Sequence, residues 1–309
     1  MPNRTGWTRR QFLLAGGGLV AAASAGVAAD AFALAPHRVA VSRMDFGLSG
    51  LAPELDGLRL AQVTDVHLYN GVHRAARRVM EVLAAEQPDV VFFLGDLCER
   101  PAELPHLEQV LAACRGRLGT FVTIGNWERQ SGITPAMLAR TCSAAGADFL
   151  FNESRVVRVG GALLVVVGLD DPVLGFPDPD RALSGAPSGA PVIWVHHGPD
   201  LEGRLPASTP RPELMLAGHT HGGQIRIPGL PPVLPRGAGR FVAGWYHDTL
   251  APLYVSRGVG TTVIRARFNC PPELPIITLR RHGAGSVAHH HRRSSGLARG
   301  HTSSSVSPS

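Results

Sequence analysis

The sequence predicts an α/β fold built in layers, within one body of about 245 residues. Three observations predict it. Short apolar runs rich in Val, Leu and Ile have the length of buried strands. Helical patterns separate the first three of these runs, which is the order expected of strand–helix–strand units. The second half of the chain has more strand-like runs, more Pro and Gly turns and fewer helical patterns.

The individual elements follow from these patterns in chain order. Strands are expected at residues 58–64, 89–94, 120–124, 163–169, 191–195, 213–217 and 253–256. Helices are expected at residues 74–87, 104–115 and 135–145. No internal repeat interrupts this order. We therefore place one domain at residues 36–281.

The N-terminal segment, residues 1–35, is expected to be a targeting segment rather than part of the body. Arg9 and Arg10 stand in the run Thr8-Arg9-Arg10-Gln11-Phe12-Leu13, which resembles the twin-arginine export signal. An uncharged stretch of mostly Ala, Gly, Leu and Val follows at residues 13–29. A small-x-small pattern at residues 31–33 could be a cleavage site. Two readings stay open here, a cleaved signal peptide and a retained N-terminal anchor.

Composition excludes several classes of protein. With 44% hydrophobic and 17% charged residues, the chain of 309 residues is not a disordered protein. Its net charge is +6, and all basic residues are Arg. Six of these arginines lie near the two ends, so the body is nearly neutral and a binding face for duplex nucleic acid is not expected. Residues 282–309, rich in Ser, His and Arg, are expected to be a disordered tail.

The four cysteines do not form a recognisable site. They are Cys98, Cys114, Cys142 and Cys270, and none stands in a CxxC pair. A structural zinc site of the usual kind is therefore not expected. Export would allow a disulfide, whereas thiols buried in the core are the simpler expectation.

Polar clusters follow the ends of five predicted strands. They are Asp65-Val66-His67, Gly95-Asp96, Gly125-Asn126-Trp127-Glu128, His196-His197-Gly198-Pro199-Asp200 and Gly218-His219-Thr220-His221-Gly222-Gly223-Gln224. In α/β sheets, ligands gather at the carboxyl ends of the strands. We therefore expect the five clusters to converge on one site.

The residue types in these clusters suit divalent metal ions. They offer carboxylate, imidazole and one amide oxygen, and no thiolate. Seven such ligands are too many for one four-coordinate ion and favour two ions that share a bridging carboxylate. Metal ions about 3.5–4 Å apart can hold a phosphoryl group between them and activate water.

The ordered series of motifs resembles the calcineurin-like metallophosphoesterase family. The residues that carry the resemblance are Asp65-x-His67, Gly95-Asp96, Gly125-Asn126, His197 and Gly218-His219-Thr220-His221. Gly222-Gly223-Gln224, together with the N-terminal segment, resembles its bacterial twin-arginine-exported branch. The resemblance spans residues 38–279 and implies a four-layer α/β/β/α sandwich around two mixed sheets.

The resemblance also implies the roles of the ligands. One metal ion is expected on Asp65, His67 and His221, and the other on Asn126, His197 and His219, with Asp96 between them. His197 is preferred to His196 because His197-Gly198-Pro199-Asp200 matches the family's His-x-Pro-Asp pattern. The metals expected are two divalent ions, Mn, Fe or Zn.

Trp127 departs from the family's pattern. A His commonly follows the Asn and contacts the phosphate or protonates the leaving group, whereas indole has no usable acid-base proton. The catalytic acid is therefore unassigned. His196 is a weak candidate, because strand alternation points it away from the site.

The sequence thus predicts an exported two-metal phosphoesterase that hydrolyses phosphomonoesters or phosphodiesters with a metal-bound hydroxide. Two alternatives remain, a pyrophosphatase of nucleotide-linked lipid intermediates and a non-catalytic metal- or phosphate-binding envelope protein. The expected partners are a phosphate ester, with a lipid-linked one as an option, the twin-arginine export machinery, and a membrane contacted through the N-terminus. The Pro-rich stretch at residues 228–235 is expected to stiffen a loop, with a lipid-accepting rim as the alternative.

Overall fold

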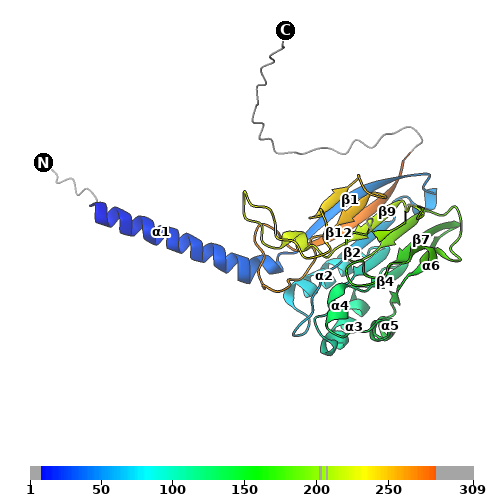
Figure 1. Ribbon diagram of the computed structural model, residues 1–309, viewed down its shortest axis with the longest axis horizontal. Coiled ribbons are helices and arrows are strands. Elements are labelled where there is room, and N and C mark those ends of the chain that lie inside the picture. The colour runs from blue at the N-terminus through cyan, green and yellow to red at the C-terminus, as the bar shows by residue number, and fades with distance from the viewer. Residues whose placement is uncertain (1–7, 202–203, 207, 283–309) are drawn as a thin grey trace, which may run out of the picture.

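Two mixed sheets form the centre of the body (Figure 1). The computed structural model describes residues 8–201, 204–206 and 208–282. The first sheet has six strands in the order β1 (Ala40–Ser49), β12 (Glu273–His282), β2 (Arg59–Val63), β3 (Val90–Leu94), β4 (Gly119–Thr123) and β5 (Asp148–Phe149). Strands β2 to β5 are parallel, β12 runs antiparallel to β2, and β1 runs parallel to β12.

The second sheet also has six strands. Their order is β10 (Gly244–Tyr246), β11 (Leu253–Val255), β9 (Leu214–Ala217), β8 (Val192–Val195), β7 (Ala162–Gly168) and β6 (Glu153–Val159). Strands β11, β9, β8 and β7 are parallel, and the two edge strands β10 and β6 are antiparallel to their neighbours. Parallel strands buried on both faces explain the continuous apolar runs of the sequence.

Helices cover the outer faces of the two sheets. The helices α2 (Arg74–Glu86), α3 (Leu104–Ala113) and α5 (Pro135–Ala144) bury their apolar sides in a cluster with the first sheet. A second apolar cluster fills the space between the sheets. A third lies on the outer face of the second sheet, where the short α6 (Pro179–Leu183) and loops pack. Helix, sheet, sheet and helix with loops make four layers, so the predicted fold class is confirmed.

The remaining helical elements are short. Helix α4 (Asn126–Gln130) follows β4 directly. Single turns lie at η3 (Pro53–Leu55), η4 (Pro101–Glu103) and η6 (His221–Gly223).

Helix α1 (Arg9–Ala29) extends away from the body and begins at a capping box formed by Thr8 and Gln11 (Figure 1). It continues into η1 (Asp30–Leu34) and η2 (Ala35–His37). Among the described residues, this segment alone is long and apolar enough to cross a membrane, and its most apolar part is not buried in the body. An N-terminal signal sequence would meet the same criteria.

The structure confirms the predicted elements and adds others. All seven predicted strands and three predicted helices are present, with each bound within two residues of its expected position. Strands β1, β5, β6, β10 and β12 and helices α4 and α6 were not expected. Strand β6 lies at a sheet edge with mostly part-exposed residues, so it lacks an apolar run.

All four cysteines are buried free thiols, so the expectation of thiols buried in the core is confirmed. The predicted tail at residues 282–309 lies, apart from the end of β12, outside the described residues.

Candidate metal centre

The five polar clusters meet where strands of both sheets end. Asp65 and His67 follow β2, Asp96 follows β3, and Asn126 begins α4 after β4. His197 follows β8, while His219 and His221 follow β9. All seven of these side chains are at least nine-tenths buried. The structure thus brings every predicted ligand into one site at the carboxyl edges of the two sheets.

The first group of ligands surrounds one ring nitrogen of His197. Its Nε2 lies 3.0 Å from the Asn126 Oδ1, 3.1 Å from the His219 Nδ1 and 3.2 Å from the Asp96 Oδ2. The Nδ1 of His197 lies 2.8 Å from the Leu94 carbonyl oxygen, and the Nε2 of His219 lies 2.9 Å from the Arg236 carbonyl oxygen. These two contacts orient the rings and leave the facing nitrogens free to bind.

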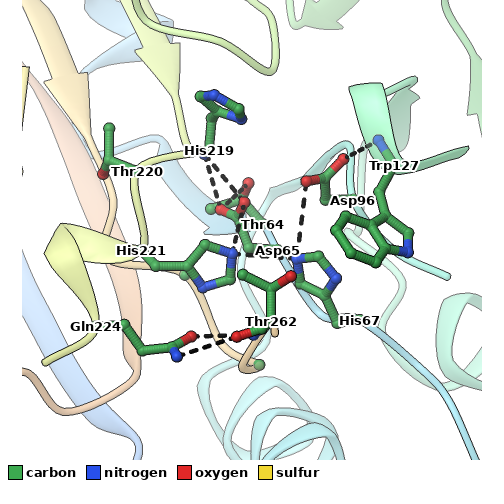
Figure 2. A network of polar contacts seen from close by, with 12 residues as sticks. Thr64, Asp65, His67, Asp96, Trp127, His219, Thr220, His221, Gln224 and Thr262 are labelled. Atoms are coloured by element: carbon green, nitrogen blue, oxygen red, sulfur yellow. Dashed lines mark hydrogen bonds and ion pairs between the residues drawn. The ribbon is translucent and has the colours of Figure 1, made fainter. Parts of the chain in front are cut away.

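The second group joins Asp65, His67 and His221 (Figure 2). The Nε2 atoms of His67 and His221 lie 3.1 Å apart, and the His221 Nε2 lies 3.5 Å from the Asp65 Oδ1. Asp96 faces this group as well, because its Oδ2 lies 3.7 Å from the His67 Nε2. The Asp96 carboxylate is therefore placed between the two groups.

The donor set of both groups fits divalent cations. In the first group, the carbonyl contacts of His197 and His219 use one N–H of each ring, so two nitrogen lone pairs face one another at 3.1 Å when both rings are neutral. Lone pairs at this distance repel unless a proton or a cation lies between them. Imidazole, carboxylate and amide oxygen are ligands suited to Zn, Fe and Mn ions. We therefore describe the two groups as a dinuclear metal centre.

The backbone at the ligands adopts an uncommon conformation. Asp65, His67, Asp96, His219 and His221 all have φ between 49° and 72°. Such left-handed conformations cost about 1–3 kcal/mol at a non-glycine residue and gather at functional sites. The tight turns that result aim two ligands of one short segment at the same point, as Asp65 and His67 do.

Close approach at the site requires glycine at position 218. A Cβ atom there would lie 2.0 Å from the Thr64 Oγ1 and 2.5 Å from the Asp65 Oδ2. The absence of a side chain lets the backbone N–H of His219 donate to the Asp65 carboxylate at 3.0 Å. Gly218 therefore ties the β9 loop to the β2 loop.

Two buried residues that sequence reasoning missed hold the ligand loops in place. The Glu128 carboxylate accepts the backbone N–H groups of Asp96, Leu97, Cys98 and Gly125 at 2.5–3.0 Å. Gly125 immediately precedes α4, so Glu128 at the third helical position supplies the carboxylate half of a capping box, while Gly125 has no side chain to supply the other half. A Glu at this helical position is a signal that the sequence carries.

Arg267 is the second of these residues, and no motif marks it. Its guanidinium is fully buried and donates to the carbonyl oxygens of Gly260, Gly258 and Arg257 at 2.6–3.2 Å. The same guanidinium lies 3.5 Å from the carbonyl oxygen of His221. It therefore links the β9 ligand loop to the loop that follows β11.

Trp127 lies beside the metal centre without offering an acid. Its backbone N–H donates to the Asp96 Oδ1 at 2.8 Å, and its indole meets the His67 ring edge-on with centroids 5.3 Å apart (Figure 2). The weak candidate His196 does not join the site. Its ring is fully buried, its Nδ1 donates to the Gly198 carbonyl oxygen at 2.8 Å, and its Nε2 has no hydrogen-bond partner among the described residues.

Burial lowers the pKa of two histidines of the site, whereas neighbouring carboxylates raise the pKa of a third. Burial lowers the pKa of His67 and of His219 to about 4 in each case, so both are neutral at physiological pH. Burial disfavours a charge on His197, but the carboxylates of Asp96, Asp65 and Asp171 together outweigh burial and raise the pKa of His197 well above its usual value. Burial alone would raise the pKa of Asp96, but the charge of His197 and its hydrogen bond to the carboxylate lower it.

Metal binding is expected to release a proton from His197. In the metal-free protein at neutral pH this ring carries a proton that faces Asp96, and the proton must leave before the nitrogen can bind a cation. A lower pH favours the protonated ring, so the affinity for Mn²⁺ should fall about tenfold per pH unit below the raised pKa of His197. Calorimetric titrations with Mn²⁺ in buffers of different ionisation enthalpy measure both effects. An affinity independent of pH, with no proton released, would contradict this account.

The family comparison agrees with the geometry of the site. Residues 58–223 match the model of the calcineurin-like phosphoesterase family, which is more than half of the chain. The chain belongs to this family. It is a metallophosphoesterase, and therefore a hydrolase, with a site for two divalent ions.

Three similar proteins are informative. The metallophosphoesterase YkuE of Bacillus subtilis is 29% identical over 285 residues, which cover 88% of this chain and 98% of the relative. The phosphodiesterase YaeI of Escherichia coli is 30% identical over 63% of this chain and 71% of its own. The UDP-2,3-diacylglucosamine pyrophosphatase LpxG of Chlamydia trachomatis is 26% identical over 79% of this chain and 90% of its own.

Proposed function

We propose that this metallophosphoesterase is exported and hydrolyses phosphomonoesters or phosphodiesters outside the cytoplasmic membrane. The observation that carries the catalytic part is the convergence of seven buried ligands on two facing pairs of imidazole nitrogens, with Asp96 between them. When bound, two divalent ions supply positive charge for the phosphoryl oxygens and lower the pKa of water. The ions proposed are Mn, Fe or Zn.

The chain's own residues position this chemistry. Water adds to phosphorus, the ester P–O bond breaks, and the leaving oxygen takes up a proton. Asp96 and the histidines would hold the two divalent ions beside the phosphoryl group. Glu128 fixes the loop that carries Asp96. Trp127 forms part of the wall of the site and has no proton to give, so the leaving oxygen takes its proton from solvent.

The leaving group is therefore expected to control the rate. The full chain loaded with Mn²⁺ should hydrolyse nitrophenyl phosphodiesters and act far more slowly on esters of simple alcohols, because a general acid usually contributes about 10²–10⁴-fold. Rates across esters of graded leaving-group pKa measure this dependence. A flat dependence would mean that another acid serves. No turnover by the metal-loaded protein of any ester would refute the proposed activity.

A second candidate is a pyrophosphatase of nucleotide-linked lipids. The likeness to LpxG, across most of both chains, favours it. Assaying release of a nucleoside monophosphate from a nucleotide-linked glycolipid, beside a simple phosphodiester, separates the two activities. Export would remove the enzyme from cytoplasmic nucleotide-linked substrates, so the phosphoesterase is the first proposal.

Export through the twin-arginine machinery is proposed from the N-terminal pattern. Arg9 and Arg10 begin α1, whose apolar surface is exposed. Replacing both by Lys keeps their charge, yet it should leave the protein in the cytoplasm because twin-arginine signals are read by a receptor rather than by charge. Fractionation of cells that produce the wild type or the Arg9→Lys, Arg10→Lys variant tests it. Normal amounts of the double variant outside the cytoplasm would refute the assignment.

A further inference from the structure

One cavity of about 560 Å³ opens directly beside the metal centre. At one end it is lined by Asp96, Asn126, His219 and His221, and Trp127 forms part of its wall. Beyond these residues the lining is mostly apolar, with Thr220, Gln224 and Thr262 as its polar members. Its volume lies within the range of about 300–1,000 Å³ that is usual for small-molecule sites. The cavity therefore combines a polar end at the metal ligands with an apolar remainder.

Two loops supply the apolar lining. The first rim loop, residues 224–236, contributes Ile227, Leu230 and Val233, and the second rim loop, residues 261–266, contributes Val263 and Ile264. These five side chains are 48–88% exposed. A group of exposed apolar residues around one opening marks a site of interaction with a protein, a ligand or a membrane.

Hydrogen bonds hold the two rim loops in this open arrangement. The Gln224 Nε2 donates to the Thr262 carbonyl oxygen at 3.1 Å, and its Oε1 accepts the Thr262 N–H at 3.0 Å (Figure 2). The same Nε2 also donates to the Ile264 carbonyl oxygen at 2.7 Å. Val263 has a φ of 58°, which is rare for a β-branched residue. The fold thus keeps Val263 exposed at the mouth in a strained conformation instead of burying it.

The mouth lies beside the base of α1. The Arg267 N–H, three residues after Ile264, donates to the Ala31 carbonyl oxygen at 2.9 Å. Phe32, which is 58% exposed, lines a small cleft together with Thr261 and Arg265. The second rim loop therefore packs against the end of a helix that is long and apolar enough to cross a membrane. Figure 1 shows α1 leaving the body on the side where the two rim loops lie.

We propose that the cavity binds a hydrocarbon chain of a membrane lipid whose phosphate ester lies at the metal centre. This inference rests on the proposed phosphoesterase function and names its class of substrate. The polar end matches a phosphate, and the apolar remainder matches a chain attached to it. The rim loops meet the bilayer near the root of α1, so the lipid enters without its chain crossing water.

A positive charge next to the cavity lining agrees with a lipid phosphate, because Arg236 follows the lining residue Pro235. Arg236 is exposed at the end of the first rim loop, and its carbonyl oxygen accepts the N–H of the ligand His219. An arginine at this point attracts an anionic headgroup toward the metal centre. A small water-soluble ester would fill the polar end alone and leave the apolar lining in contact with water.

A series of esters that differ in one chain tests the proposal. The full chain, loaded with Mn²⁺ in phosphatidylcholine nanodiscs, is assayed with nitrophenyl methyl, hexyl and dodecyl phosphates. Each methylene that becomes buried should raise kcat/KM up to about fourfold. The double variant Leu230→Asp, Ile264→Asp should lower the ratio of the dodecyl to the methyl rate by about tenfold or more, since charge at the rim disfavours a bound chain. Both positions are exposed, so the fold should accept the change.

Leu118→Asp is the matched control, because Leu118 is 41% exposed, immediately precedes β4 and does not line the cavity. It should keep the wild-type ratio. Partition of the esters into the nanodisc is the same for all three proteins and cancels in the comparison. Equal ratios in the wild type and the double variant would overturn the lipid site while hydrolysis of the methyl ester upholds the phosphoesterase.

Binding of methyl- and dodecylphosphonate by calorimetry keeps the test independent of turnover. If the wild type hydrolyses no ester, the proposed function fails, and the phosphonates still decide the site. A dodecyl preference that the double variant loses supports the site, and equal affinity for the two phosphonates overturns it.

Discussion

Asp96→Asn is expected to abolish the dinuclear centre. The Asp96 carboxylate lies 3.2 Å from the His197 Nε2 and 3.7 Å from the His67 Nε2, so it faces both groups of ligands. Asn keeps the size of the side chain but removes the negative charge that offsets two dications. Loss of several kcal/mol of transition-state stabilisation corresponds to a fall in kcat of about 10³-fold or more. Metal analysis of the purified protein and turnover of a nitrophenyl phosphodiester measure the two effects.

Asp89→Asn is a matched control, because Asp89 immediately precedes β3 and Asp96 follows the same strand. Asp89 is buried beside the start of β3, away from the metal centre, where it accepts the Arg59 N–H at 2.8 Å and pairs with Arg117. This variant should lose some stability and keep both metal ions and activity. If Asp96→Asn retained wild-type metal content and turnover, the assignment of the centre would be wrong.

The sequence was sufficient to predict that the expected ligands lie together, because the ends of buried strands are recognisable. A buried parallel strand reads as an apolar run, and the polar residues that follow it can only lie at one edge of the sheet. The positions of Asp65, Asp96 and His219 after such runs therefore predict that the three side chains are neighbours, and they are. The sequence does not predict the left-handed backbone of these residues, because that conformation depends on contacts between loops far apart in the chain.

Residues that act through the backbone were harder to predict. Arg267 binds mainly main-chain carbonyl groups, which no sequence motif marks, and Glu128 is marked only as a Glu three residues after Gly125. The second wall of the cavity was missed for a related reason. The two rim loops are 38 residues apart at the Gln224–Thr262 contact, and only the fold joins them. The Pro-rich stretch at residues 228–235 suggested a stiff loop, with a lipid-accepting rim as the alternative, and in the fold it carries one wall of the cavity.

Glu128→Gln is expected to weaken metal binding without removing a ligand. The carboxylate accepts four backbone N–H groups from the loops that carry Asp96 and Asn126, and it is fully buried. Gln has the same shape, but its NH₂ group must face two of these donors. Each buried donor left unpaired costs about 1–3 kcal/mol, and loss of such support around a metal typically lowers affinity about 10–100-fold. Thermal unfolding of the metal-free protein and Mn²⁺ titration follow the two effects separately.

Glu103→Gln separates support of the metal centre from general stability. Glu103 is also buried, and it accepts the Gly71 N–H at 2.9 Å and pairs with Arg100 and His106, but none of its partners is a metal ligand. Both variants should unfold at a lower temperature than the wild type, because each leaves buried donors without a full set of acceptors. Only Glu128→Gln should also lower the affinity for Mn²⁺ and, with it, kcat at limiting metal. Excess Mn²⁺ should restore much of that activity, since every ligand is still present. Wild-type Mn²⁺ affinity in Glu128→Gln, beside a loss of stability equal to that of Glu103→Gln, would show that Glu128 merely stabilises the fold.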